Sequence, residues 1–294
     1  MKQILTLLTI LIFHNYVPAQ TTYVGYIDKY PIEFVTDLYS DGDASAFYIY
    51  TSYDEPIKIN GTLKNGLLKL NEKSITNKDI ATLTFKDFNP KSNIIEGVWK
   101  EISSNKELKI TLTKSFNIDN GDGIEWKNIE LLQPTTFKNK YFKLLISKEK
   151  GSYYANVTGL KIFEKKTDKL IQKINLECQL WGLNNISVED YNFDNILDFS
   201  VFEQSYAGPN TSSLYFLYNS KTNKYFESGF SGTSLEFDGK TKRIYERNQC
   251  CAGSVVTTAE YKVVSNKMVL LKEQCFKWNE KKQELIQRKM KACQ

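Results

Sequence analysis

The sequence predicts an all-β protein in which an N-terminal antiparallel meander or small barrel precedes a propeller-like antiparallel β domain. Tyr and Phe are plentiful among its 294 residues, at 18 and 17, whereas Pro is scarce at 6. Short runs of alternating polar and apolar residues recur along the chain, and turn signals separate them. Asn65-Gly66 is the strongest of these hairpin signals. Together these features are typical of antiparallel strands joined by short turns.

Residues 1–19 are predicted to be a signal peptide. Lys2 forms a short positive region, and the apolar run over 4–13 is too short to span a bilayer. Val17-Pro18-Ala19 is a small-residue cleavage site, so the mature chain is expected to start near Gln20. No later run approaches the length of a membrane span. The product is therefore expected in the periplasm or outside the cell, without a membrane span.

The residue inventory excludes several chemistries. The only His, His14, lies inside the predicted signal peptide, so the mature protein has no histidine. Catalysis by Ser-His-Asp or Cys-His sets is therefore excluded, as are zinc sites with His ligands. The net charge of +5 is spread along the chain, with no long basic run and no nucleic-acid motif, so no nucleic-acid partner is expected. We do not expect an enzyme.

The first part of the mature chain, residues 20–115, is expected to be a β domain of its own. Its predicted strands cover 23–27, 32–35, 46–51, 57–63, 67–70, 80–88, 94–99 and 108–112. Local pairing of about eight strands predicts a curved sheet or a small barrel. Residues 116–136 are expected to be a linker, because the run DNGDG at 119–123 and Pro134 are turn formers.

The remainder, residues 137–294, is expected to form the propeller-like domain. Its predicted strands cover 142–147, 153–163, 169–176, 196–204, 213–218, 224–230, 234–237, 243–246, 257–264, 267–276 and 285–290. Successive hairpins of similar length predict propeller-like or sandwich stacking.

A Ca²⁺ site is predicted in the acidic segment VEDYNFDNILDF at residues 188–199. Side-chain oxygens fall at loop positions 1, 3, 5 and 9, and a backbone carbonyl takes position 7. The predicted ligands are Asp190, Asn192, Asp194, Ile196 (by its carbonyl) and Asp198. An EF-hand would carry Gly at position 6 and Glu at position 12, where this chain has Asn195 and Val201, so we expect the shorter loop type that closes with Asp at position 9. The alternative is a polar turn whose Asp and Asn side chains bond their own backbone.

The chain has five cysteines, which are Cys178, Cys250, Cys251, Cys275 and Cys293. An oxidising compartment permits disulfides, and the spacing alone leaves the pairing open. Adjacent Cys250 and Cys251 are not expected to bond each other within one extended segment. One of them is expected to pair with Cys275, because both positions flank one predicted hairpin. The odd thiol is expected to be buried and inert.

Four motifs of the second half lie in the order found in a known family: GLKIFEKKTDKLIQKI (159–174), VEDYNFDNILDF (188–199), SSLYFLYNSKTNKYF (212–226) and NQCCAGS (248–254). Over residues 137–287 the chain resembles secreted bacterial proteins related to a periplasmic immunity protein against a lysozyme-like effector of a type IV secretion system. This resemblance implies a propeller-like fold, Ca²⁺ at the acidic loop and binding to a peptidoglycan-cleaving enzyme. The segments 23–34, 52–63 and 94–100 resemble an uncharacterised β module at the front of exported bacterial proteins.

The expected function is therefore a protein-binding module, an inhibitor or immunity protein whose partner is a lysozyme-like enzyme. Calcium would fix the start of a strand at Ile196 and hold the loops over 205–213 and 248–254 rigid beside it. The predicted partner-binding residues give the first loop an aromatic tip among polar neighbours; they are Ser205, Tyr206, Gly208 and Asn210. Two alternatives stay open. One is a glycan-acting hydrolase, which would need two carboxylates such as Glu125 and Glu130. The other is a cell-surface scaffold or carbohydrate-binding module.

Overall fold

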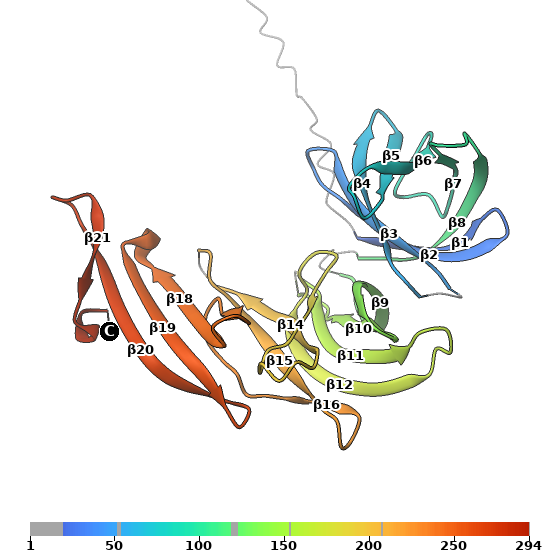
Figure 1. Cartoon of the computed structure of the whole chain (residues 1–294). Helices are drawn as coiled ribbons and strands as arrows, with labels where there is room; N and C mark the ends of the chain where they lie inside the picture. Colours follow the sequence, from blue (N-terminus) through green and yellow to red (C-terminus); the bar gives the residue numbers. More distant parts are fainter. Residues whose placement is uncertain (1–19, 52–53, 119–122, 153, 207, 294) are drawn as a thin grey trace, which may run out of the picture.

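The computed structural model describes residues 20–51, 54–118, 123–152, 154–206 and 208–293, and within these ranges the protein is all-β. The predicted fold class is confirmed: a small closed barrel precedes three antiparallel sheets, which lie in an open, propeller-like row (Figure 1). The signal-peptide prediction for 1–19 lies outside the described residues. Among the residues that the structure describes, no helix is long and apolar enough to cross a membrane.

The barrel contains eight antiparallel strands, each paired with the next, and β1 pairs with β8 to close it. The strands are β1 (Thr21–Ile27), β2 (Tyr30–Leu38), β3 (Asp43–Tyr50), β4 (Ile57–Lys64), β5 (Leu67–Lys73), β6 (Asp79–Phe85), β7 (Ile94–Glu101) and β8 (Glu107–Asn117). A Cβ on Gly61 would lie 1.8 Å from the carbonyl oxygen of Lys69, so only glycine lets β4 and β5 approach this closely. Alternate apolar residues, among them Tyr23, Phe34 and Leu83, fill the interior.

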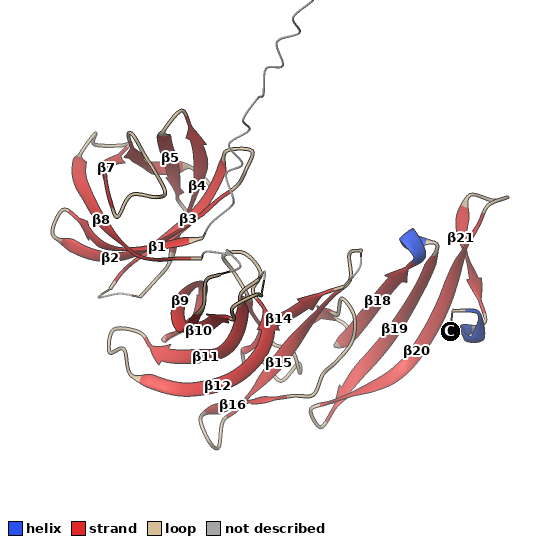
Figure 2. Cartoon of the chain, turned by 180° about the vertical axis from the view of Figure 1, so that it is seen from behind, coloured by secondary structure: helices blue, strands red, loops and turns tan. Residues whose placement is uncertain are grey.

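The second half forms three sheets in chain order (Figure 2). The first sheet holds β9 (Trp126–Phe137), β10 (Lys140–Lys148), β11 (Asn156–Glu164) and β12 (Leu170–Gln179). The second sheet holds β13 (Ile186–Glu189), β14 (Asp198–Ser205), β15 (Thr211–Asn219) and β16 (Lys224–Glu227). The third sheet holds β17 (Glu236–Asp238), β18 (Arg243–Cys250), β19 (Val255–Val264), β20 (Lys267–Asn279) and β21 (Glu284–Arg288). Two single 3₁₀ turns, η1 (Cys251–Gly253) and η2 (Met290–Ala292), follow β18 and β21.

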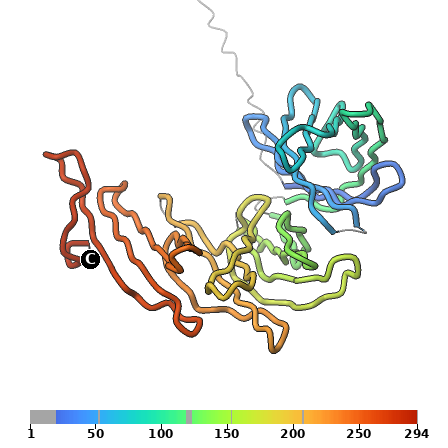
Figure 3. The backbone as a smooth tube through the Cα atoms, viewed as in Figure 1, coloured from blue at the N-terminus to red at the C-terminus, as the bar shows by residue number. Residues whose placement is uncertain are grey.

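The sheets stack because the middle one is apolar on both faces. Along β15, Phe216 joins the cluster shared with the first sheet, whereas Tyr215 and Leu217 join the cluster shared with the third sheet. Successive strand residues point to opposite faces, so a near-continuous apolar run is what a strand buried on both sides requires. The backbone trace shows the resulting row of sheets, with the C-terminus lying against the last one (Figure 3).

The barrel packs on the first sheet through side chains that point out of the barrel. Ala46 and Tyr48 of β3 belong to the barrel interior, whereas Phe47 and Ile49 belong to the cluster that contains Phe142 of the first sheet. At the edge of this contact, the Asp54 carboxylate accepts a hydrogen bond of 2.7 Å from the backbone N–H of Lys166, and Lys165 pairs with Glu55. A shared apolar cluster with a polar edge joins the two parts into one packed body.

The expected linker over 116–136 differs from the structure. Strand β9 begins at Trp126, within that range, and pairs with β10. Its apolar residues Leu131 and Leu132 are buried, which favours a strand over a solvated linker. Pro134 is tolerated because β9 is an edge strand and its register with β10 shifts at this point. The linker prediction was therefore wrong for 126–136.

Candidate functional site

The acidic loop curls between β13 and β14, and its carboxylates bind its own backbone. The two carboxylate oxygens of Asp190 accept hydrogen bonds from the N–H groups of Asp194 at 3.0 Å and Asn195 at 2.7 Å. Asp194 accepts a bond of 2.8 Å from the N–H of Ile196. Asn195 has φ 68°, the left-handed conformation that Gly takes at position 6 of related loops and that Asn tolerates. These contacts hold the backbone in a tight curl.

Asp198 closes the loop as its buried carboxylate, with 1 % of its surface exposed. Burial, with a smaller contribution from the nearby charges of Asp194 and Asp190, raises the pKa of this carboxyl to about 6. The N–H groups of Tyr218 (2.8 Å) and Tyr191 (3.1 Å) donate to its two oxygens and act in the opposite direction. The carboxylates of Asp190, Asp194 and Asp198 thus lie near one partly desolvated point, and a divalent cation there would offset their mutual repulsion.

The oxygen atoms of the acidic loop suit a hard cation, but they also accept hydrogen bonds from the loop's own backbone. Among the described residues there is no group of three or more His, Cys, Asp or Glu side chains placed to hold a metal. The predicted set reaches its ligand number only by adding the amide oxygen of Asn192 and the carbonyl of Ile196. The observed side-chain to backbone bonds are those of the alternative polar turn. Calcium binding stays a prediction.

The acidic loop also contacts the third sheet. Asn192 Nδ2 donates to Asn266 Oδ1 at 3.0 Å, in the turn between β19 and β20. Lys242 Nζ donates to the carbonyl oxygen of Phe193 at 3.3 Å, just before β18. The loop therefore links the second sheet to the third, and any ion held there would act on this packing.

A second site forms where the loop after β14 meets the end of β18. Asn210 is buried, and its Nδ2 donates to the carbonyl oxygen of Gln249 at 2.7 Å and to Asn248 Oδ1 at 3.1 Å. Its Oδ1 accepts from the N–H of Gln249 at 3.1 Å. The described residues of the loops over 205–213 and 248–254 thus lie side by side, joined by the amide side chain of Asn210.

The joined loops line an open groove of about 910 Å³. Its walls are Tyr206, Gly208, Pro209, Asn210, Thr233, Asn248, Gln249, Cys250, Cys251, Ala252 and Gly253. Tyr206 is 45 % exposed, and its hydroxyl accepts a hydrogen bond from Gln204 Nε2 at 2.8 Å. Ser205 lies at the end of β14, where its N–H donates to Gln179 Oε1 at 3.0 Å. Three of the four predicted partner-binding residues, all but Ser205, therefore line one concave surface.

The two sites lie at opposite ends of β14, which corrects the expectation that calcium would rigidify adjacent loops. Asp198 is the first residue of β14 and Ser205 is the last. Seven strand steps separate them by about 23 Å. The acidic loop therefore cannot touch the groove directly. Sequence reasoning placed the loops beside each other because it did not follow the strand from one end to the other.

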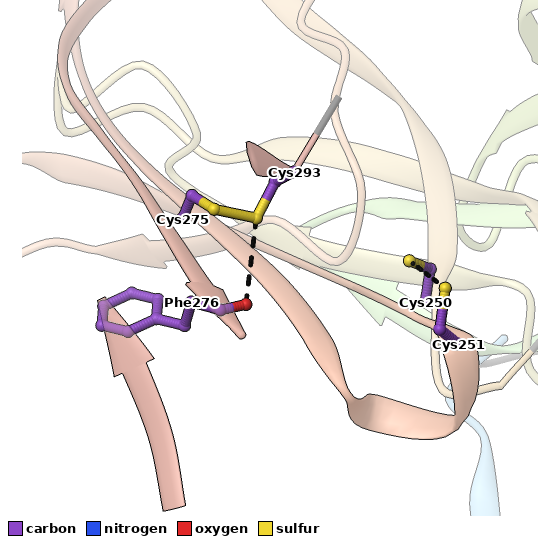
Figure 4. Close-up of a disulfide and its surroundings, with 5 residues drawn as sticks. All are labelled: Cys250, Cys251, Cys275, Phe276 and Cys293. Carbon is purple, nitrogen blue, oxygen red and sulfur yellow. Dashed lines mark hydrogen bonds between the residues drawn. A yellow bond between two sulfur atoms is a disulfide. The ribbon is translucent and has the colours of Figure 1, made fainter. Parts of the chain in front are cut away.

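The expected disulfide of Cys275 with Cys250 or Cys251 was wrong. Cys275 is bonded to Cys293, with their Cα atoms 5.9 Å apart, and Cys250 and Cys251 are free and exposed (Figure 4). Strand β19 lies between β18 and β20, so two inter-strand spacings of about 4.8 Å separate Cys250 from Cys275. That separation exceeds the roughly 7 Å that a disulfide can bridge. Cys178 is the buried free thiol.

The carboxylates considered for a hydrolase each engage a lysine. Glu125 pairs with Lys127 at 2.8 Å, and Glu130 pairs with Lys161. Hydrogen bonding to Lys127 lowers the pKa of Glu125, whereas a general acid needs a raised one. The groove residues that the sequence did not single out individually are Pro209, Thr233, Asn248, Gln249, Ala252 and Gly253. The motif NQCCAGS contains four of them and was the available signal.

Comparison with known proteins finds no family model and no curated protein that matches the chain. Among solved structures, the β-propeller domain of the Trilobed protease from Pyrococcus furiosus is 10 % identical, covering 91 % of this chain and 84 % of that one, with a TM-score of 0.24. A protein from Lactobacillus plantarum is 9 % identical over 92 % and 95 %, with a TM-score of 0.21. An oligogalacturonate lyase in complex with manganese is 10 % identical over 92 % and 72 %, with a TM-score of 0.22. Scores this low carry no argument about the function of this chain.

Proposed function

We propose that this chain is an exported protein-binding module that inhibits a lysozyme-like, peptidoglycan-cleaving enzyme. The observation that carries the proposal is the groove, in which two loops distant in sequence are locked together by the hydrogen bonds of Asn210. A concave wall with a half-exposed aromatic residue, Tyr206, is the arrangement from which binding hot spots are built. The resemblance of residues 137–287 to an immunity protein gives the proposed partner class.

Calcium has a structural role in this proposal. A cation at Asp190, Asp194 and Asp198 would neutralise charge around the buried carboxyl and secure the link to Asn266 and Lys242 in the third sheet. The third sheet also provides β18, whose end forms one wall of the groove. Calcium would therefore support the groove indirectly, through the packing of the second and third sheets.

The test is inhibition of a lysozyme. Purified full-length protein is added at micromolar concentration to a lysozyme acting on purified peptidoglycan, with calcium present, and the rate of hydrolysis is measured. The proposal expects the rate to fall, and it expects Tyr206→Ala to weaken binding by about 2 kcal/mol or more, as truncation of a central aromatic anchor does.

The matched control is Tyr26→Ala, which removes another half-exposed tyrosine, 53 % exposed, from the barrel. It should inhibit as the unaltered protein does. An unchanged hydrolysis rate at micromolar protein would refute the lysozyme assignment. Equal loss of inhibition in both variants would show that the groove is not the contact surface.

A further inference from the structure

Cys250 and Cys251 bring two thiols together at the rim of the groove. In a continuous strand their side chains would point to opposite faces. Strand β18 ends at Cys250, which is extended at φ −130°, and Cys251 turns into the left-handed region at φ 56°. The turn places the two Sγ atoms 3.0 Å apart, and Figure 4 shows them directed toward one another. The expectation that these neighbours cannot bond assumed one extended segment, which the structure does not have.

Both thiols are accessible. Cys250 and Cys251 are exposed, and both line the open groove, so a small disulfide reagent can approach either sulfur. The remaining thiol, Cys178, is buried. The pair therefore differs from every other cysteine of the chain: it is reduced, adjacent and open to solvent.

We propose that Cys250 and Cys251 are a redox modification site that closes reversibly to a vicinal disulfide, with a low-molecular-weight disulfide as the oxidant. One thiol loses its proton to solvent, and its thiolate attacks the reagent disulfide, forming a mixed disulfide and releasing one reagent thiolate. The neighbouring thiol then loses its proton and attacks the mixed disulfide, forming the Cys250–Cys251 bond and releasing the second reagent thiolate. The two cysteines are oxidised by two electrons in total, and the reagent is reduced to two thiols, which take up the two protons.

This bond should be the labile one of the protein. Consecutive Cα atoms are only about 3.8 Å apart, below the usual disulfide range of about 4.4 to 6.8 Å. A bond outside the preferred geometry is more easily reduced, as is an exposed one. The Cys275–Cys293 bridge has Cα atoms 5.9 Å apart, within that range, and Cys275 is fully buried. The two sites should therefore respond to different redox conditions.

A closed Cys250–Cys251 disulfide would act on the groove through Gln249, the residue that comes before the pair. Gln249 precedes the pair and exchanges two hydrogen bonds with Asn210. A bond between the thiols constrains the chain that follows Gln249, and this chain forms part of the groove wall. The modification itself does not rest on lysozyme binding, and the two can fail separately.

The experiment equilibrates purified full-length protein at graded ratios of oxidised to reduced glutathione, traps free thiols with N-ethylmaleimide and digests with trypsin. Cleavage after Arg247 and Lys262 isolates both cysteines on one peptide, apart from Cys178, Cys275 and Cys293. As the oxidised fraction rises, we expect the doubly labelled peptide to be replaced by an unlabelled one. The unlabelled peptide should be two hydrogen atoms lighter than the same peptide with both thiols reduced. The transition should occur at ratios where Cys275–Cys293 stays closed.

Single variants separate ring closure from ordinary thiol capping. In Cys251→Ser, Cys250 can only form the mixed disulfide, so the same peptide should carry one glutathione at oxidising ratios. In Cys250→Ser, Cys251 should do likewise. The proposal is overturned if the unaltered peptide stays doubly labelled at every ratio, if it carries glutathione on both cysteines, or if it links two chains.

Discussion

The side chain of Asn210 exchanges both of its hydrogen-bonding functions with the backbone of Gln249. Its Nδ2 donates to the Gln249 carbonyl oxygen at 2.7 Å, and its Oδ1 accepts from the Gln249 N–H at 3.1 Å. Strand β17 pairs with only the first part of β18, so Gln249 has no strand partner on that side. Asn210 takes the place of that partner. This amide joins the two walls of the groove directly, beside a backbone route in which Ser234 bonds Thr211 and Thr233 bonds Arg247.

Asn210→Ala is expected to destabilise the protein by about 1 to 2 kcal/mol, because it leaves the part-buried N–H and C=O of Gln249 without the partner that both contact. Urea unfolding monitored by tryptophan fluorescence measures the loss. Asn248→Ala is the control: it removes a single bond to Asn210 Nδ2 and should cost less than about 1 kcal/mol. Equal costs for the two variants would contradict the bridging role.

Calcium is expected to raise the free energy of unfolding by about 1.4 kcal/mol at a tenfold excess over its Kd, because only the folded loop gathers the oxygens. With three carboxylates, we expect a Kd on the order of 10⁻⁴ to 10⁻³ M. Thermal unfolding with calcium and with chelator measures the gain, and Asp194→Ala should abolish it.

Asp238→Ala is the control for this experiment. Asp238 also bonds backbone N–H groups in a turn, those of Lys240 at 2.8 Å and Thr241 at 3.3 Å, but it lies outside the acidic loop. The variant should keep the full calcium gain. Identical unfolding temperatures of the unaltered protein in calcium and in chelator would refute the site.

The hairpins could be read from the sequence, because each depends on residues close together along the chain. Asn65-Gly66 and the alternation over 57–70 specify β4 and β5 without any distant contact. Closure of the barrel could not be decided, and the sequence left a meander and a barrel open. It depends on pairing Thr21 with Asn117 across the whole barrel sequence, which no local pattern encodes.

The site was predictable in its parts and not in its arrangement. Asn210 and Tyr206 were marked by residue type, and both line the groove. The pairing of Cys275 with Cys293 was missed because it depends on the order of strands and on the return of η2 to β20. The contact between Cys250 and Cys251 was missed because the left-handed turn at Cys251 has no signature in a non-glycine residue.

Phe47→Ala is expected to destabilise the protein by about 3 to 5 kcal/mol, because this fully buried ring fills the contact between the barrel and the first sheet. Urea unfolding followed by circular dichroism measures the loss. Phe226→Ala removes a ring of the same size that is 39 % exposed, and it should cost about 0.5 kcal/mol or less. A similarly small effect of Phe47→Ala would show that the two parts do not stabilise each other.

Cys178 should make the stability of the protein pH-dependent in the alkaline range. Burial raises the pKa of its thiol from 9.0 to about 12, so the fold favours the neutral thiol. The contribution of the neutral Cys178 thiol to the free energy of unfolding is complete below pH 9. It is lost as the pH rises toward 12, because only the unfolded chain releases the proton, and the free energy of unfolding then falls by up to about 1.4 kcal/mol per pH unit. Cys178→Ala lacks this term, so the stability difference between the unaltered protein and the variant should shift by about 2 kcal/mol between pH 8 and pH 10.5. Urea unfolding of both proteins under argon measures it, and parallel pH profiles would mean that the thiol ionises equally easily in both states.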